Sequence, residues 1–97
     1  MITTKERASL KGLAHKLKVS VQVGKEGITD TVLNEIDVAL FNKELIKVKL
    51  LKTADLDKKD AMHQIGTKLN AEEILVVGNI LVLYRFSDKE GVEHINF

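Results

Sequence analysis

The stretch VQVGKEGITD, residues 21–30, decides the fold, because a strand end, a glycine loop and a helix start follow one another within ten positions. Apolar and polar residues alternate over residues 19–23, which predicts a half-buried strand. After the loop, Thr29 or Asp30 can cap a helix. The apolar face of that helix is predicted from residues at helical spacing, namely Val32, Leu33, Ile36, Ala39 and Leu40.

The loop between this strand and this helix is a candidate anion site. It consists of Gly24, Lys25, Glu26 and Gly27. The N–H groups of a glycine-bracketed turn and the positive end of a helix dipole can face a phosphate, and Lys25 adds a full charge. The alternative is a plain turn in which both glycines adopt left-handed backbone angles. Glu26 favours that alternative, because its carboxylate repels phosphate.

Elements on either side of this stretch are predicted from hydrophobic periodicity. A first helix begins at a capping box formed by Thr3 and Glu6 and ends near Lys18. Residues 44–51, ELIKVKLL, alternate as a second strand, with Lys47 and Lys49 on the side opposite the apolar residues. The acidic stretch at residues 53–60 precedes a third helix that buries Met62, Ile65 and Leu69.

The last two strands flank Gly78-Asn79, a pair that favours a type II′ hairpin with glycine at positive φ. Both runs are apolar on their two faces, so we expect this hairpin in the centre of the sheet. Tyr84 and Phe86 are predicted core residues, and the tail after Phe86 is predicted to be a loop that could end in a short strand. The chain, residues 1–97, is therefore expected to form one α+β domain. It is a two-layer sandwich with a mixed four-stranded sheet in the order α-β-α-β-α-β-β.

Composition excludes several classes of protein. The 97 residues include no cysteine, which excludes disulfides and thiolate metal sites and is typical of a reducing compartment. The amino terminus is too polar for a secretory signal, and the most apolar segment, residues 74–84, is too short for a membrane helix. We therefore expect a cytoplasmic protein with no membrane contact.

Catalytic and cofactor motifs are absent from the sequence. His15, His63 and His94 do not have metal-ligand spacing, and there is neither GxxxxGK[ST] nor GxGxxG. No pair of carboxylates is set apart for acid–base chemistry. We therefore expect no enzyme, no metal, no cofactor and no small-molecule substrate.

Positive charge is concentrated in the first half of the chain. Residues 1–52 contain ten Lys/Arg and six Asp/Glu, a net charge of +4, whereas residues 53–97 have a net charge of −3. Helical spacing places four basic residues of the first helix on one face, and Lys47 and Lys49 add a pair on the second strand. The four are Arg7, Lys11, His15 and Lys18. With the glycine loop, they predict a surface for a phosphate backbone. The four aromatic residues are too few for a single-strand stacking platform, so structured RNA is favoured.

Three segments resemble the CRM domain family, named for chloroplast RNA splicing and ribosome maturation. They are ERASLKGLAHKLKVSVQVGKEGIT (6–29), ALFNKELIKVKL (39–50) and GNILVLYR (78–85). The chain is most similar to the small stand-alone bacterial members, the YhbY-like proteins, over residues 4–86. The resemblance implies a fold like the C-terminal domain of translation initiation factor 3. It also implies a glycine loop that contacts RNA as the GxxG loop of KH domains does. The family loop reads GKxG, with Glu26 here at the variable position, and Lys43 stands where many relatives have histidine.

The residues and the resemblance together predict an RNA-binding protein without catalytic residues. The resemblance implies ribosomal RNA in precursors of the large ribosomal subunit, and a role in ribosome assembly. The expected contacts are Gly24, Lys25, Glu26, Gly27, Arg7, Lys11, Lys18, Lys47 and Lys49. The alternative is a protein–protein adapter that docks through an apolar sheet face or through the acidic C-terminal half. A monomer is expected if the first helix covers the second face of the sheet, and a dimer if that face is open.

Overall fold

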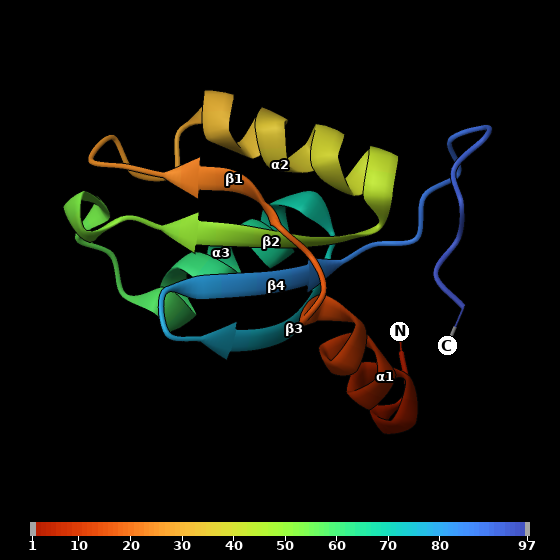
Figure 1. Ribbon diagram of the computed structural model, residues 1–97. Coiled ribbons are helices and arrows are strands. Elements are labelled where there is room, and N and C mark those ends of the chain that lie inside the picture. Colours follow the sequence, from red (N-terminus) through yellow and green to blue (C-terminus); the bar gives the residue numbers. More distant parts are fainter. Residues whose placement is uncertain (1, 97) are drawn as a thin grey trace.

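The computed structural model describes residues 2–96 and has a four-stranded mixed sheet with helices on both faces (Figure 1). The strands lie in the order β1-β2-β4-β3. β1 runs parallel to β2, and β4 runs antiparallel to both of its neighbours. This confirms the predicted α+β class and the order of elements. The bounds are α1 Thr4–Ala14, β1 Val19–Val23, α2 Asp30–Lys43, β2 Leu45–Leu50, the 3₁₀ turn η1 Lys52–Ala54, α3 Lys58–Leu69, β3 Glu72–Val77 and β4 Ile80–Tyr84.

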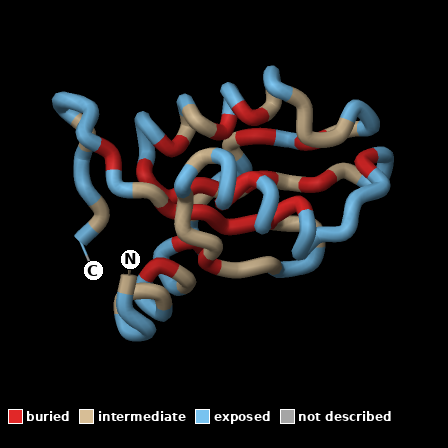
Figure 2. The backbone as a smooth tube through the Cα atoms, turned by 180° about the vertical axis from the view of Figure 1, so that it is seen from behind, coloured by how far each residue is buried: buried red, intermediate tan, exposed pale blue. Residues whose placement is uncertain are grey.

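The main core lies between the sheet and the pair α2 and α3. Side chains from both helices meet the apolar side of β2, and Figure 2 shows buried residues on the strands and on the inner sides of these helices. Arg85, just after β4, joins α2 to α3: its guanidinium donates to Asp37 Oδ1 at 2.7 Å and to the Leu69 carbonyl at 3.0 Å. Fully buried members of this core include Val23, Ile36, Leu40, Val48, Ile65, Leu81 and Leu83.

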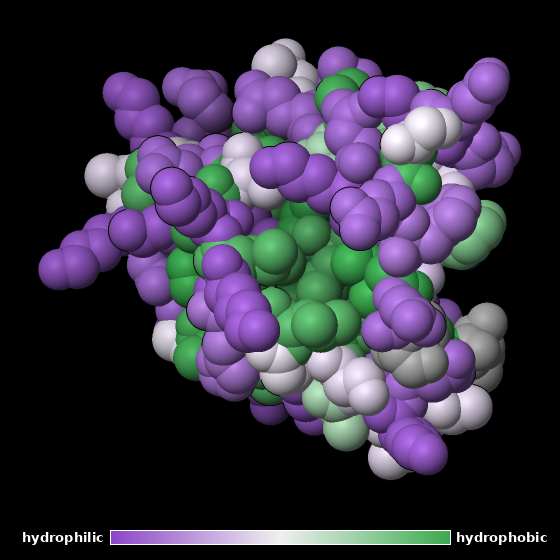
Figure 3. Space-filling view, turned by 45° about the vertical axis from the view of Figure 1, so that its right-hand side comes forward, coloured by the Kyte–Doolittle hydropathy of each residue, from purple (hydrophilic) through white to green (hydrophobic). Residues whose placement is uncertain are grey.

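α1 packs on the opposite face of the sheet and adds a partial third layer, which the two-layer expectation did not include (Figure 1). Leu10 and Ala14 are buried against Leu45, Val82 and Tyr84. This helix is short, so it covers one end of the face and leaves the other open. Figure 3, which brings the right-hand side of Figure 1 forward, shows an apolar area of the surface ringed by hydrophilic side chains.

Helix starts follow the predicted caps, but the end of α1 differs from the prediction. The Thr3–Glu6 capping box is present, and the Thr29 hydroxyl accepts from the Val32 N–H at 3.1 Å. α1 ends at Ala14 and not near Lys18. Glycine at position 12 weakens the last turn, and the chain must then turn so that Val19 can pair with β2. No helix among the described residues is long and apolar enough to cross a membrane.

The hairpin turn is confirmed, whereas only one of its strands is central. Gly78 has φ of 57°, as a glycine at the first position of a type II′ turn requires. β4 lies between two strands, but β3 is an edge strand and its Val77 is 52% exposed. The assignment of Phe86 to the core was wrong: β4 ends at Tyr84, and Phe86 is 64% exposed and stacks on the His94 ring at 4.6 Å.

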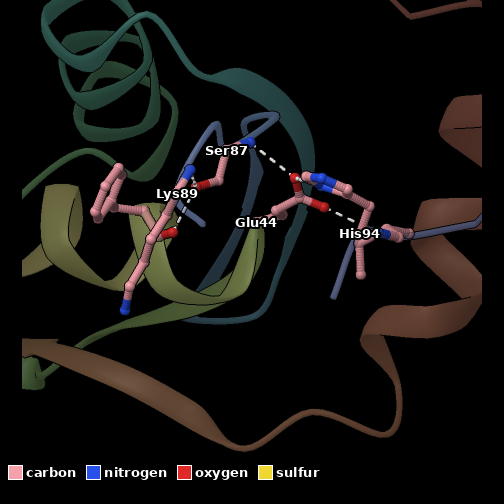
Figure 4. Close-up of polar contacts among 6 residues, drawn as sticks. Glu44, Ser87, Lys89 and His94 are labelled. Carbon is pink, nitrogen blue, oxygen red and sulfur yellow. Dashed lines mark hydrogen bonds and ion pairs between the residues drawn. The ribbon is translucent and has the colours of Figure 1, made fainter. Parts of the chain in front are cut away.

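The C-terminal segment after β4 contains no strand up to residue 96 and is tied to the end of α2 by the buried Glu44 (Figure 4). Glu44 Oε2 accepts from the Ser87 N–H at 2.7 Å and lies 2.8 Å from His94 Nδ1, and Oε1 accepts from the Ile95 N–H at 2.9 Å. Burial alone raises the pKa of Glu44, but these hydrogen bonds outweigh burial and lower it from 4.5. The carboxylate therefore fastens the tail in its charged form.

Candidate functional site

Lys47 and Lys49 lie on the open end of the α1 face. Alternation along β2 sends Ile46, Val48 and Leu50 into the main core, so the two lysines point to the other side of the sheet. Lys47 pairs with Val82 on β4, and Lys49 pairs with Ile80. Neither lysine is fully exposed, since their stems lie along the sheet. Among residues 2–96, no helix covers this part of the strand face, because α1 ends at Ala14. The predicted binding role of the two lysines requires such an open face.

The basic side of α1 meets β2 at a hollow of about 100 Å³. The polar residues of its lining are Lys11 of α1, His15 at the C-cap of that helix and Lys47 of β2. The sequence had placed these side chains on two separate elements, and the packing of Leu10 and Ala14 of α1 with Leu45 of β2 brings the elements together. Its other lining residues are apolar: Ala14, Leu75, Val77, Ile80 and Val82.

Two predicted basic residues lie outside this group. Arg7 is turned toward β3, where its guanidinium donates to the Glu73 carbonyl and lies 3.7 Å from Glu72 Oε2. Arg7 therefore joins α1 to β3 and is not a free cation on the basic face of the helix. Lys18 is exposed, but it follows the end of α1, so the helical spacing that grouped it with Lys11 does not apply.

The glycine loop forms a tight turn that is held by hydrogen bonds between backbone groups of the chain itself. The Gly27 N–H donates to the Gly24 carbonyl at 3.0 Å, and the Thr29 N–H donates to the Gly27 carbonyl at 3.2 Å. Only Gly27 has a positive φ, 75°, whereas a side chain at Gly24 would meet its neighbours at ordinary contact distances. Gly27 thus fits the plain-turn interpretation, and Gly24 has no such backbone requirement.

Charges at the loop are mixed. Lys25 is exposed at the tip, but Glu26 is exposed beside it, and Asp30 occupies the first turn of α2. Both acids oppose anion binding at the helix N-terminus. The loop can therefore attract phosphate chiefly through the Lys25 side chain. Lys52 of η1, which sequence reasoning missed, lies in the loop that packs beside Gly24 through Leu51 and Thr53.

The basic residues on the α1 face of the sheet follow one another along β2. From the hollow, the line passes from Lys47 to Lys49 along β2, about 7 Å for two residues. Gln22 pairs with Lys49, and the chain then continues through Val23 to the glycine loop. Lys11, His15, Lys47 and Lys49 thus form a basic strip on the α1 face of the sheet, and the glycine loop with Lys25 follows the end of the neighbouring strand β1.

Sequence reasoning missed the apolar half of this surface. Val77 and Ile80 were assigned to a hairpin covered on both faces, whereas they lie on the open end of the sheet. The signal that could have found them is Gly12, which weakens the last turn of the first helix, so that the helix ends before it covers the whole sheet face. Among residues 2–96, no group of three or more His, Asp or Glu side chains has an arrangement that could hold a metal ion.

Comparison with known proteins gives a consistent family. Residues 2–85 match the CRS1 / YhbY (CRM) domain. A Haemophilus influenzae protein named "RNA-binding protein" is 39% identical over 92 residues, 95% of this chain and 93% of that protein. The Bacillus subtilis protein named "Probable RNA-binding protein YqeI" is 36% identical over 90% of this chain and 91% of its own length.

A solved structure has the same fold. The solution structure of the hypothetical protein SAV1595 from Staphylococcus aureus, described in its title as a candidate RNA-binding protein, superposes with a TM-score of 0.79. The two are 35% identical, and the match covers 96% of this chain and 98% of the other. The sheet order, the glycine loop and these matches lead to one conclusion. The chain belongs to the CRS1 / YhbY (CRM) domain family.

Proposed function

We propose that this chain is a non-catalytic RNA-binding protein whose contact surface is the basic strip on the α1 face of the sheet. The observation that carries the proposal is the convergence of Lys11 and His15 with Lys47 at one hollow, with Lys49 next along the strand. Lysines that share an open face can neutralise neighbouring phosphates of one strand. The names of the relatives, which call them RNA-binding proteins, support the same function.

Within this surface, each element has a distinct part. Lys47 and Lys49 hold phosphates over the sheet, Lys11 extends the contact onto α1, and Lys25 reaches the RNA from the tip of the glycine loop. Arg7 stays on β3 and keeps α1 in place. Lys18, exposed beside β1, adds a long-range attraction only.

The proposed target is ribosomal RNA in precursors of the large ribosomal subunit, where the protein assists assembly in the cytoplasm. Family resemblance supports this target, and the small number of exposed aromatic rings favours structured RNA over an extended single strand.

The protein acts as a monomer, since α1 covers part of the apolar face of the sheet. Analytical ultracentrifugation measures this state directly.

The decisive experiment is an RNA-binding titration of the wild type and the double variant Lys47→Gln/Lys49→Gln at several salt concentrations. Each lost phosphate contact should reduce the log–log salt slope by about 0.7–0.9, so the double variant should lose about 1.5. The matched control is Lys58→Gln/Lys68→Gln, which removes two exposed lysines of α3 on the other face. Equal slopes in all three proteins would refute the proposed surface.

A second experiment tests the target. The tagged protein should sediment with large-subunit precursors in a cell extract, and the double variant should leave these fractions. Sedimentation that persists in the double variant and in high salt would instead indicate docking on a protein, the adapter alternative. RNA binding in vitro without such sedimentation would show that the RNA is a different one.

A further inference from the structure

The hollow between α1 and the open end of the sheet has an aliphatic floor that phosphate binding does not explain. Val82 and Ile80 of β4 lie beside Leu75 and Val77 of β3 in two neighbouring cross-strand rows. Val77 is half exposed, and Leu75 and Ile80 are partly so. Lysines on a polar strand face would bind a sugar–phosphate backbone as well as lysines beside an apolar floor do. The floor therefore indicates a second, apolar part of the ligand.

The size of the hollow limits the apolar part of the ligand to about one ring. Its volume is about 100 Å³. An apolar cavity of about 150 Å³ accommodates a benzene molecule, and sites for drug-sized ligands run from about 300 Å³ upward. A hollow of this size, open on one side, can take most of one base ring. It is too small for a complete cofactor or for two stacked bases.

The charges around the hollow favour an anionic ligand. Its rim carries Lys11, His15 and Lys47, and none of its lining residues is acidic. Four larger hollows on the described residues each have a carboxylate in their lining, contributed by Glu73, Asp55, Glu72 and Asp57. An apolar floor with a cationic rim matches the two ends of a nucleotide, which has a flat, weakly polar base and a negative phosphate.

We infer that this hollow receives one unpaired nucleotide, with the base on the aliphatic floor and the phosphate on Lys11 and Lys47. The inference rests on the proposed RNA binding and narrows it to RNA that carries a bulged or looped-out residue. Bases inside a paired helix cannot reach the floor, because stacking and pairing keep them in the duplex. A fully paired RNA is thus left with the phosphate contacts alone.

The test compares two RNA duplexes of equal length, one fully paired and one with a single bulged 2-aminopurine. The proteins are the wild type, Val77→Ser and the matched control Val38→Ser, which changes a similarly exposed valine on α2. We expect the wild type to bind the bulged duplex about tenfold more tightly than the paired one, from the apolar area that the base buries. Val77→Ser should reduce this preference to about twofold.

Two further readouts separate this inference from general RNA binding. The 2-aminopurine fluorescence should change on binding to the wild type and to Val38→Ser, and much less with Val77→Ser. Lys25→Ala should weaken binding to both duplexes by the same factor and keep the preference, because Lys25 lies on the glycine loop and does not line the hollow.

Equal affinity of the wild type for both duplexes, with a normal salt slope, would overturn the inference and leave the proposed function standing. If the wild type binds neither duplex, or binds both with no dependence on salt, the inference and the proposed function are both wrong. If Val77→Ser changes the sedimentation of the free protein and not its preference for the bulge, the floor is a contact between two copies of the chain, and the inference is wrong.

Discussion

Glu44→Gln is the substitution for which the structure predicts the largest loss of stability at constant side-chain size. The carboxylate is fully buried and accepts hydrogen bonds from two tail amides and from His94. Glutamine has a single oxygen. If that oxygen takes the place of Oε2, the amide nitrogen faces the Ile95 N–H, so two donors oppose each other.

The magnitude follows from these contacts. A hydrogen bond to a charged group contributes about 1.5–3 kcal/mol, and a buried donor left unpaired costs about 1–3 kcal/mol. The easier burial of a neutral amide offsets part of this loss. We therefore expect a decrease of about 2–4 kcal/mol in the free energy of unfolding, against a total of about 5–15 kcal/mol for a domain. The melting temperature should fall by about 10–25 °C.

The assay is urea unfolding at pH 7 with Glu93→Gln as control, since Glu93 is an exposed glutamate on the same tail. Hydrogen exchange of the Ser87 and Ile95 amides reports whether the tail detaches before the domain unfolds. Both amides should exchange faster in Glu44→Gln only. The reasoning is refuted if both variants stay within about 0.5 kcal/mol of the wild type and amide protection is unchanged.

Lowering the pH should remove from the wild type the contribution that the ionised Glu44 makes to the free energy of unfolding. The hydrogen bonds hold the pKa of Glu44 below 4.5 in the folded chain, although burial alone raises it. The stability from Glu44 is therefore present in full above the unfolded pKa and is lost as pH falls through the folded value. The difference in unfolding free energy between the wild type and Glu44→Gln should narrow below about pH 4.5. A constant difference down to pH 3 would contradict this assignment.

The remaining predictions concern α1, α2 and α3. Arg7→Gln should lower the unfolding free energy by about 1–2 kcal/mol, because it breaks the tie to β3, and Lys11→Gln should leave it unchanged. Gly66→Ala should destabilise by about 1–3 kcal/mol, because its methyl group would meet Glu73 Cγ at 2.9 Å and the Ala71 carbonyl at 3.2 Å. Gly12→Ala, where nothing lies within 4 Å, should instead stabilise by about 0.5–1 kcal/mol. Thr29→Ala should cost about 1 kcal/mol through loss of the N-cap. Denaturant unfolding checks all five variants, and a reversed order of the two glycine variants would contradict the steric argument.

The sequence alone was enough for the features that depend on local periodicity and local hydrogen bonds. The Thr3–Glu6 capping box, the cap at Thr29 and the Gly78 turn each lie within four residues of their partners. Alternation along β2 also predicted that Lys47 and Lys49 share a face. Such features need no knowledge of distant parts of the chain, because the period of a strand or helix decides them.

Tertiary structure decided everything that depends on contacts between distant residues. Arg7 and Lys11 look equivalent on a helical face, yet of the two it is Arg7 that donates a hydrogen bond to β3, 66 residues away. Glu44 reads as an ordinary charged residue before a strand, but the returning tail buries it 43 and 51 positions later. The hollow likewise exists only because α1 is too short to cover the sheet face onto which it folds. Local sequence carries no record of such partners, since strand pairing and helix docking bring them together only in the folded chain.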